Sequence, residues 1–149
     1  MRNWFKILLI LTIFFGISIY VNFRPQNIPD PDSLYHIRHA WIYQMNGIFD
    51  SSFPWTQFSA IRTIGADLWY GFHILLIPLT YISDLTIAIK IAAVLITFLV
   101  LASFRVALKN IDIKFSELWA ILFLFSSPAI ITRMTMMRPH PLSLGLTAL

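Results

Sequence analysis

The sequence predicts an all-α integral membrane protein, a multi-span helical bundle whose long first external loop carries an amphipathic helix. Composition is the first reason, because 58% of the 149 residues are hydrophobic and only 12% are charged. Soluble domains carry about 25% charged residues. The second reason is that the apolar residues gather in runs about as long as a bilayer is thick. A soluble core would not bury this much apolar surface, so we expect most of the chain to lie in lipid.

The formal net charge of +4 does not indicate a protein that binds nucleic acid. The Lys and Arg residues are scattered between apolar runs and form no continuous basic stripe. Basic residues beside apolar runs instead set the orientation of membrane spans. The chain contains no cysteine, which excludes disulfides.

The first predicted span covers residues 5–23, in the run "WFKILLILTIFFGISIYVNF". Arg2 and Lys6 lie at its start and Arg24 closes it. A cleaved signal peptide would have a shorter apolar region and a small-x-small cleavage site, and the sequence "IYVNF" at the far end offers none. We therefore expect an uncleaved span in the plasma (inner) membrane, with the N-terminus in the cytoplasm.

A polar external loop is predicted over residues 24–84, followed by spans at 85–104 and 116–132. The number of crossings depends on the 16-residue apolar run inside 67–83. If this run also crosses, the basic segment 105–114 lies outside, which the positive-inside rule disfavours. We favour a surface or re-entrant helix at 67–83, because the run is short and contains a histidine and a proline. The basic segment is then cytoplasmic, and the last span returns outward.

Residues 141–149 are predicted to begin a further span, although a full crossing needs about 20 residues. We therefore expect the sequence to be the N-terminal part of a longer membrane protein. In the favoured topology, Arg133, Arg138 and His140 emerge on the same side as the polar loop.

A helix is predicted to begin at Asp30-Pro31, since Asp is a good N-cap and Pro suits the first helical position. Apolar residues then recur every three or four positions, and polar residues fall on a second face. The apolar face contains Leu34, Ile37, Trp41, Met45 and Ile48, and the polar face contains Asp32, His36, His39 and Tyr43. We expect this helix to lie on the membrane surface.

Asp32 is the first candidate for chemistry, because Asp30 already supplies the cap. A carboxylate beside His36 suits a general base, or a ligand of a divalent cation assisted by imidazole. Asp30 itself is explained by capping and by the helix dipole. Arg38 suits a lipid phosphate as well as a substrate.

Four further residues have both a functional and a structural explanation. Asp67 and His73 are six positions apart, on opposite sides of an ideal helix, so they line one cleft only if a bend intervenes. Otherwise they mark where an apolar helix meets water. Arg133 and Arg138 suit phosphate binding, but basic residues also end membrane helices by reaching toward headgroups.

The segment "DSLYHIRHA", residues 32–40, resembles the GT-C superfamily of membrane glycosyltransferases, and in particular the N-terminal part of oligosaccharyltransferase catalytic subunits. The matching residues are Asp32, Tyr35, His36 and Arg38. The segment "NGIFDSSFPWT" is similar to the stretch that follows in that family. The family also has a span to the cytoplasm, a basic turn and a span back. Its second acidic motif is missing from "SPAIITRMTMMRPHPLSLG", which favours other GT-C chemistry over protein N-glycosylation.

The resemblance implies transfer of a sugar from a polyprenyl-phosphate-linked donor to an acceptor glycan, lipid or protein at the external face. Asp32 would be catalytic, and a divalent cation (Mg²⁺ or Mn²⁺) would be bound by Asp32, His36 and His140. Substrate contacts are expected from Arg38, Arg133, Arg138, Asp67 and His73. A transporter or a non-catalytic membrane subunit is the alternative, as is a fragment that is inactive alone. The nearly charge-free spans favour interfacial chemistry over transport.

Overall fold

The computed structural model describes residues 2–28, 30–52 and 63–148, and every regular element within these ranges is a helix. The elements are α1 (Arg2–Phe23), α2 (Pro31–Asn46), α4 (Tyr70–Leu76), the 3-10 helix η1 (Ile77–Tyr81), α5 (Leu85–Asn110), α6 (Ser116–Phe125), α7 (Pro128–Thr135) and α8 (Pro139–Thr147). The predicted all-α class is therefore confirmed. Residues 53–62 of the predicted external loop lie outside the described residues.

Two helices are long and apolar enough to cross a membrane, namely α1 over Trp4–Phe23 and α5 over Leu85–Asn110. At about 1.5 Å per residue, each is at least as long as the roughly 30 Å hydrocarbon layer. Asp84 begins α5, because its carboxylate accepts hydrogen bonds from the backbone N–H groups of Thr86 at 2.8 Å and Ile87 at 3.3 Å. These helices agree with the predicted spans at 5–23 and 85–104, although α5 continues for six residues beyond 104.

A buried polar contact holds the two long helices together. The Asn22 side chain on α1 donates to the hydroxyl of Thr97 on α5 at 3.1 Å. The Thr97 hydroxyl also lies 3.1 Å from the backbone oxygen of Met134 on α7. Hydrogen bonds of this kind stabilise helix association in lipid, where apolar burial gives little driving force between helices.

The third predicted span, 116–132, differs from a single straight helix. It consists of α6 and α7, which are bent by 90° at a short break. Ser127 caps α7 by accepting a hydrogen bond from the backbone N–H of Ala129 at 3.2 Å, and Pro128 follows at the first helical position. Because a proline cannot donate to the preceding turn, the helix restarts here in a new direction. The chain has a third crossing only if this bent pair forms one span.

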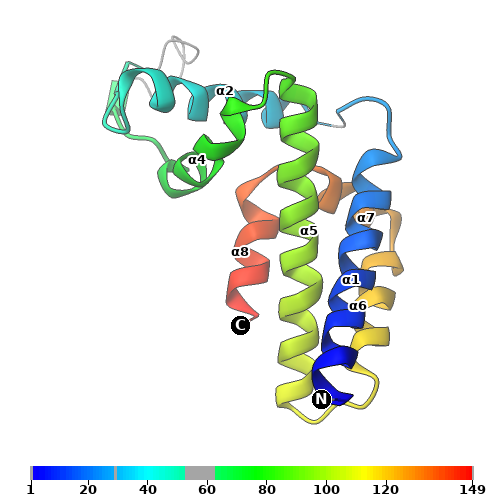
Figure 1. Cartoon of the computed structure of the whole chain (residues 1–149). Coiled ribbons are helices and arrows are strands. Elements are labelled where there is room, and N and C mark those ends of the chain that lie inside the picture. Colours follow the sequence, from blue (N-terminus) through cyan, green and yellow to red (C-terminus); the bar gives the residue numbers. More distant parts are fainter. Residues whose placement is uncertain (1, 29, 53–62, 149) are drawn as a thin grey trace.

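The apolar run predicted as a surface or re-entrant helix at 67–83 forms α4 and η1, which together span only Tyr70–Tyr81. This pair is too short to cross a bilayer as a straight helix. It packs against α2 at one end of the bundle, as Figure 1 shows. The favoured arrangement, in which this run is no regular span, agrees with the structure.

The two ends of the bundle differ in character. Helices α2 and α4 lie across the end where α5 begins, whereas the N-terminus and the turn between α5 and α6 lie at the opposite end (Figure 1). The described helices of the predicted external loop, α2 and α4, therefore lie at the end opposite to the basic turn between α5 and α6. Helix α8 packs alongside α5. A Cβ added at Gly145 would lie 3.1 Å from the Leu99 side chain, so the two helices are close at this point.

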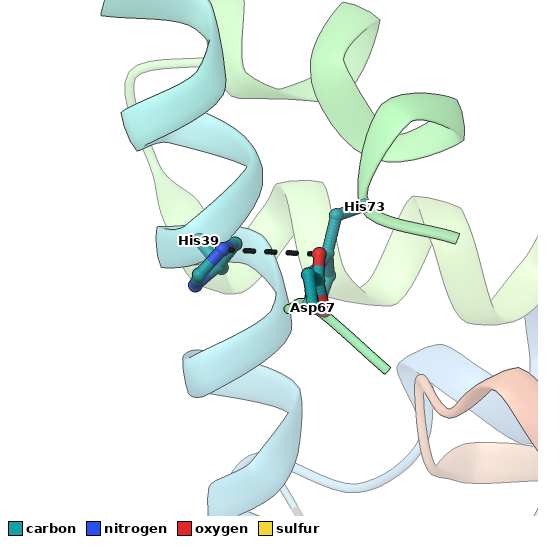
Figure 2. Close-up of side chains that lie close together, drawn as sticks. All are labelled: His39, Asp67 and His73. Atoms are coloured by element: carbon teal, nitrogen blue, oxygen red, sulfur yellow. Dashed lines mark hydrogen bonds and ion pairs between the residues drawn. The ribbon is translucent and has the colours of Figure 1, made fainter. Parts of the chain in front are cut away.

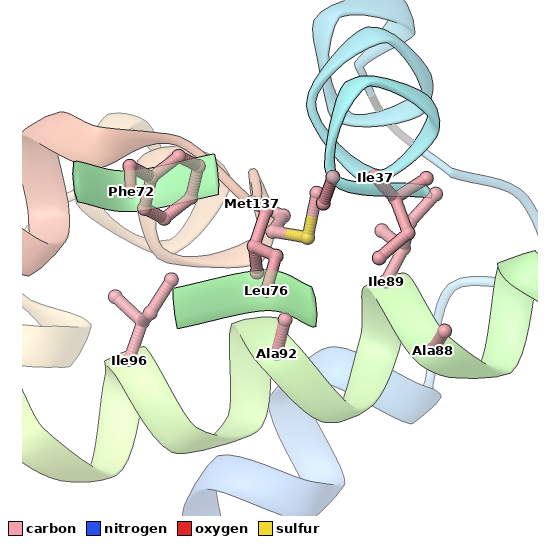
Figure 3. Packing of buried hydrophobic residues seen from close by; sticks show 9 residues of the cluster. Ile37, Phe72, Leu76, Ala88, Ile89, Ala92, Ile96 and Met137 are labelled. Atoms are coloured by element: carbon pink, nitrogen blue, oxygen red, sulfur yellow. The ribbon is translucent and has the colours of Figure 1, made fainter. Parts of the chain in front are cut away.

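A hydrophobic cluster attaches the surface helix α2 to the bundle. Its buried members come from α2, α4, α5 and the turn before α8, and Figure 3 shows their packing. They are Ile37, Ala40, Phe72, Leu76, Ala88, Ile89, Ala92, Ile96 and Met137. Met137 is completely buried, so the turn that carries Arg138 and leads to His140 at the start of α8 is anchored against α2.

Cysteine labelling tests the predicted orientation, since the natural chain has no cysteine of its own. Ser51 and Asn110 are both exposed. Ser51 follows α2, whereas Asn110 is the last residue of α5, and α2 lies at the end of the bundle where α5 begins. In intact cells we expect Ser51→Cys to react with an impermeant maleimide, and Asn110→Cys to react only after permeabilisation. Labelling of Asn110→Cys in intact cells would contradict the orientation, and the unmodified chain is the control for background.

Candidate functional site

Asp30 forms a buried ion pair with Arg138. Its side chain is only 2% exposed, and its two oxygens accept from the Arg138 guanidinium at 2.6 and 2.7 Å. Its capping contact to the backbone N–H of Asp32 is longer, at 3.4 Å. The hydrogen bonds from Arg138 are the main reason that the pKa of the Asp30 carboxyl is lowered, in spite of burial. The interpretation of Asp30 as only a helix cap is therefore incomplete.

Arg138 also contacts the second carboxylate of this segment. Its Nη2 lies 2.9 Å from Oδ2 of Asp32, whose side chain is 55% exposed. The Ser33 hydroxyl donates to Asp30 at 3.3 Å and accepts from the backbone N–H of Met137 at 3.2 Å. The start of α2 and the turn before α8 are thus joined by several polar contacts, with one exposed carboxylate at their edge.

A small cavity of about 130 Å³, which we call the polar pocket, opens beside this contact. It is lined by Asp32, Tyr35, His36, Trp69, Arg138, Pro139 and His140. The three residues predicted to bind a divalent cation, Asp32, His36 and His140, are therefore brought to one cavity, although they come from distant parts of the chain. The sequence placed them on one side of the membrane but did not show that they meet.

On the side of its Nδ1, His36 contacts His73, which in turn contacts Asp67. Its Nδ1 lies 2.8 Å from Nε2 of His73, and Nδ1 of His73 lies 2.6 Å from the Asp67 carboxylate. Burial is the largest cause that lowers the pKa of His36, to about 4. The His36 imidazole is therefore neutral near pH 7, which suits a ligand or a hydrogen-bond acceptor.

The Asp67 carboxylate lies beside His39 and His73, as Figure 2 shows. It accepts from the Tyr43 hydroxyl at 2.8 Å and from the backbone N–H of Trp69 at 2.9 Å. Nε2 of His39 lies 3.8 Å away. Burial alone would raise the pKa of Asp67, but the hydrogen bonds, led by the one from His73, outweigh it and lower the pKa to about 2.

The bend needed to bring Asp67 and His73 together is present, because α4 begins only at Tyr70. Their side chains are 2% and 0% exposed. They therefore support the polar pocket through His36, and they do not line it as predicted substrate contacts would. His39 lies on the predicted polar face of α2, where it is a candidate ligand beside His36. Its spacing of three positions from His36 was the available signal that both imidazoles point the same way.

The predicted arginines occupy different surroundings. The Arg38 guanidinium lies 4.0 Å from the centre of the Trp41 ring, a cation–π contact, and Arg38 does not line the polar pocket. Arg133 is exposed and lines a more open cavity of about 460 Å³, which we call the basic pocket. The basic pocket is lined by Arg133, Met134, Arg138, His140, Pro141 and Leu144.

An apolar groove of about 170 Å³ lies between α4, α5 and α8. Its lining residues are Phe72, Leu75, Leu76, Leu79, Ala92, Leu95, Ile96, Leu99 and Leu142. Phe72 also contacts the His36 ring edge to face, with 5.1 Å between the ring centres. The groove and the polar pocket are therefore neighbours.

Comparison with protein-family models, with curated proteins and with solved structures finds no match for this chain. The GT-C resemblance of residues 32–40 stays a prediction.

Replacing Asp30 tests the buried ion pair. We expect Asp30→Ala to lower the free energy of unfolding by an amount near the low end of the roughly 3–5 kcal/mol typical of a broken buried pair. The low end applies because the Arg138 side chain is 26% exposed. Asp32→Ala, at the exposed edge of the same contact, is the matched control and should cost less than about 1 kcal/mol. Equal losses in the two variants, measured by reversible unfolding in detergent, would contradict this difference.

Acid should destabilise the fold through His36. The pKa of this residue falls from an ordinary 6.5 to about 4 in the folded chain, so between these pH values the unfolded chain binds the extra proton. The free energy of unfolding should therefore fall as the pH is lowered through this window, by about 1.4 kcal/mol per pH unit for one proton.

Unfolding in detergent, followed from about pH 7.5 to about pH 4.5, measures this slope. His36→Gln should flatten it, whereas His140→Gln, which changes an exposed imidazole, should leave it unchanged. An undiminished slope in His36→Gln would contradict the assignment.

Proposed function

We propose that this chain forms part of a GT-C-type membrane glycosyltransferase, which transfers a sugar from a polyprenyl-phosphate-linked donor to an acceptor at the external face. The observation that carries the proposal is that Arg138 and His140 line both the polar pocket and the basic pocket. Asp32 and Arg133 therefore belong to one continuous site. An exposed carboxylate next to an exposed cation suits a reaction that activates a hydroxyl and releases a phosphate.

The donor phosphate is best assigned to Arg133 and His140. Arg138 already contacts the carboxylates of Asp30 and Asp32, so these three groups together carry a formal charge of −1. Such a cluster does not attract an anion. Arg133 is exposed, and within the described residues its side chain makes no ion pair with a carboxylate. It can therefore stabilise charge on the leaving phosphate.

The apolar groove supports a lipid-linked donor. It lies beside the polar pocket, and its lining residue Leu142 on α8 is two positions from His140. The first part of a polyprenyl tail would lie against α4, α5 and α8, with the remainder in the bilayer. This arrangement would place the phosphate near the basic pocket.

The acceptor hydroxyl is assigned to the side of the site that contains Asp32. The Asp32 carboxylate would act as its base, or would hold Mg²⁺ or Mn²⁺ through its oxygens, with His36 and His140 contacting the water ligands of the ion. For His36, Nε2 is the nitrogen left for this role, because Nδ1 lies against His73. A bound cation would supply Lewis-acid activation of the hydroxyl and charge neutralisation.

The transporter alternative gains no support from the two long helices. Transporters place ionisable residues near the middle of their spans. Among the residues of α1 and α5 whose side chains the structure describes, the basic and acidic residues lie toward the ends of the helices. They are Lys6, Lys90, Arg105 and Lys109. Lys90 donates to the backbone oxygen of Pro25 at 2.6 Å, so it ties the start of the external loop to α5.

Sugar transfer by the full-length protein tests the proposal. With a polyprenyl-phosphate-linked sugar as donor, Asp32→Asn should lower kcat by about 100-fold or more, because a general base typically contributes at least that factor. Arg133→Ala should reduce kcat/KM for the donor. Arg38→Ala is the matched arginine control, since Arg38 stacks on Trp41 away from both pockets. Undiminished transfer by Asp32→Asn would contradict the proposed role.

A further inference from the structure

The interior between α2 and α4 contains an unusual polar group. Three histidines, His36, His39 and His73, are 4%, 1% and 0% exposed. His39 and His73 lie beside the carboxylate of Asp67, and His36 contacts His73. Within the described residues, the ion pairs of Asp67 involve only histidines. A buried ionised carboxylate needs a compensating positive charge. Among the described residues neither Lys nor Arg supplies it, and a protonated imidazole or a bound cation can do so.

We propose that His39, Asp67 and His73 form a binding site for one divalent transition-metal ion, with Zn²⁺ as the preferred ion. Each residue offers one donor atom, and the three atoms lie within 4.8 Å of one another. Figure 2 shows His39 of α2 facing Asp67 and His73 across the contact between the two segments. Nothing in the proposed sugar transfer requires this site, which is distinct from the polar pocket.

The distances are close to those of a metal centre. The ion pairs measure 2.6 Å from His73 and 3.8 Å from His39 to the same Asp67 oxygen. Ligands on a tetrahedral Zn²⁺ with bonds of about 2.0–2.2 Å are roughly 3.3–3.6 Å apart. To bind the ion, the separation between His73 and Asp67 must lengthen and the other two separations must shorten, by on the order of 1 Å. Rotation of the side chains can supply changes of this size.

The donor types favour a transition metal. Two imidazole nitrogens and one carboxylate oxygen suit Zn²⁺, whereas Mg²⁺ and Ca²⁺ prefer oxygen ligands. Three protein donors leave one tetrahedral position open. The Tyr43 hydroxyl, 2.8 Å from the same Asp67 oxygen, is placed to take or border that position.

The outer contacts are those that metal ligands ordinarily have. A ligating histidine usually donates its second N–H to a fixed acceptor. With Nδ1 of His73 on the ion, its Nε2–H would donate to Nδ1 of His36, which lies 2.8 Å away. The free oxygen of Asp67 is held by the backbone N–H of Trp69 at 2.9 Å. The ion would thus tie α2 to α4 and fix the His36 ring at the edge of the polar pocket.

Zn²⁺ binding to the full chain tests this site without donor or acceptor, so its result is independent of sugar transfer. The protein, purified without a histidine tag and treated with a chelator, is titrated with Zn²⁺ by calorimetry and with Co²⁺ by visible spectroscopy. We expect about one equivalent per chain, a histidine-containing tetrahedral Co²⁺ spectrum, and a higher thermal midpoint with Zn²⁺. His39→Gln should remove the midpoint rise, and His36→Gln should weaken binding by about 10–100-fold.

His140→Gln and Asp32→Asn are the controls, because these residues line the polar pocket and not the buried group. Both should retain Zn²⁺ binding. The proposal is overturned if the wild-type chain binds no Zn²⁺, or if binding survives His39→Gln but is lost in the controls. If Asp67→Asn does not fold, His39→Gln and the Co²⁺ spectrum of the wild-type chain still test the site. A Co²⁺ spectrum that shows no histidine ligands would exclude it.

Discussion

The contact between Asp30 and Arg138 is the constraint on which the site depends. These residues are 108 positions apart, and their two-point hydrogen bonding joins the start of α2 to the turn before α8. His140 follows this turn at the start of α8, and Met137 in the turn is buried in the cluster beneath α2. Because a broken buried ion pair is costly, the contact holds the walls of the polar pocket in one arrangement.

The same contact decides how charge is distributed over the site. Arg138 forms ion pairs with the carboxylates of Asp30 and Asp32, which neutralise its positive charge. In the proposed reaction the cationic role toward a phosphate would pass to Arg133, which lines the adjoining basic pocket. The carboxylate of Asp32 remains at the exposed edge. The proposed acceptor side and donor side would then follow from the neutralisation of Arg138 and the availability of Arg133.

A second layer of polar residues supports this surface from inside. His73 and Asp67 hold the ring of His36, while His39 and Tyr43 complete the group from α2. Burying so many polar groups is favourable only when they satisfy one another. The group also connects α2 to α4, beside the hydrophobic cluster that attaches α2 to the bundle. Stability of this end of the bundle and geometry of the polar pocket therefore depend on the same residues.

The sequence by itself determined the all-α class, the spans near 5–23 and 85–104, and the helix start at Asp30, because hydropathy and capping are local properties of the chain. It also named Asp32, His36 and His140 as candidate metal ligands, but only the structure brings them to one pocket. Only the tertiary structure decided that Asp30 pairs with Arg138, that the last apolar run bends at Pro128, and that His39 lies beside Asp67. Each of these depends on which distant segments pack together, or on how a local break is oriented by its neighbours, and hydrophobic periodicity does not specify either.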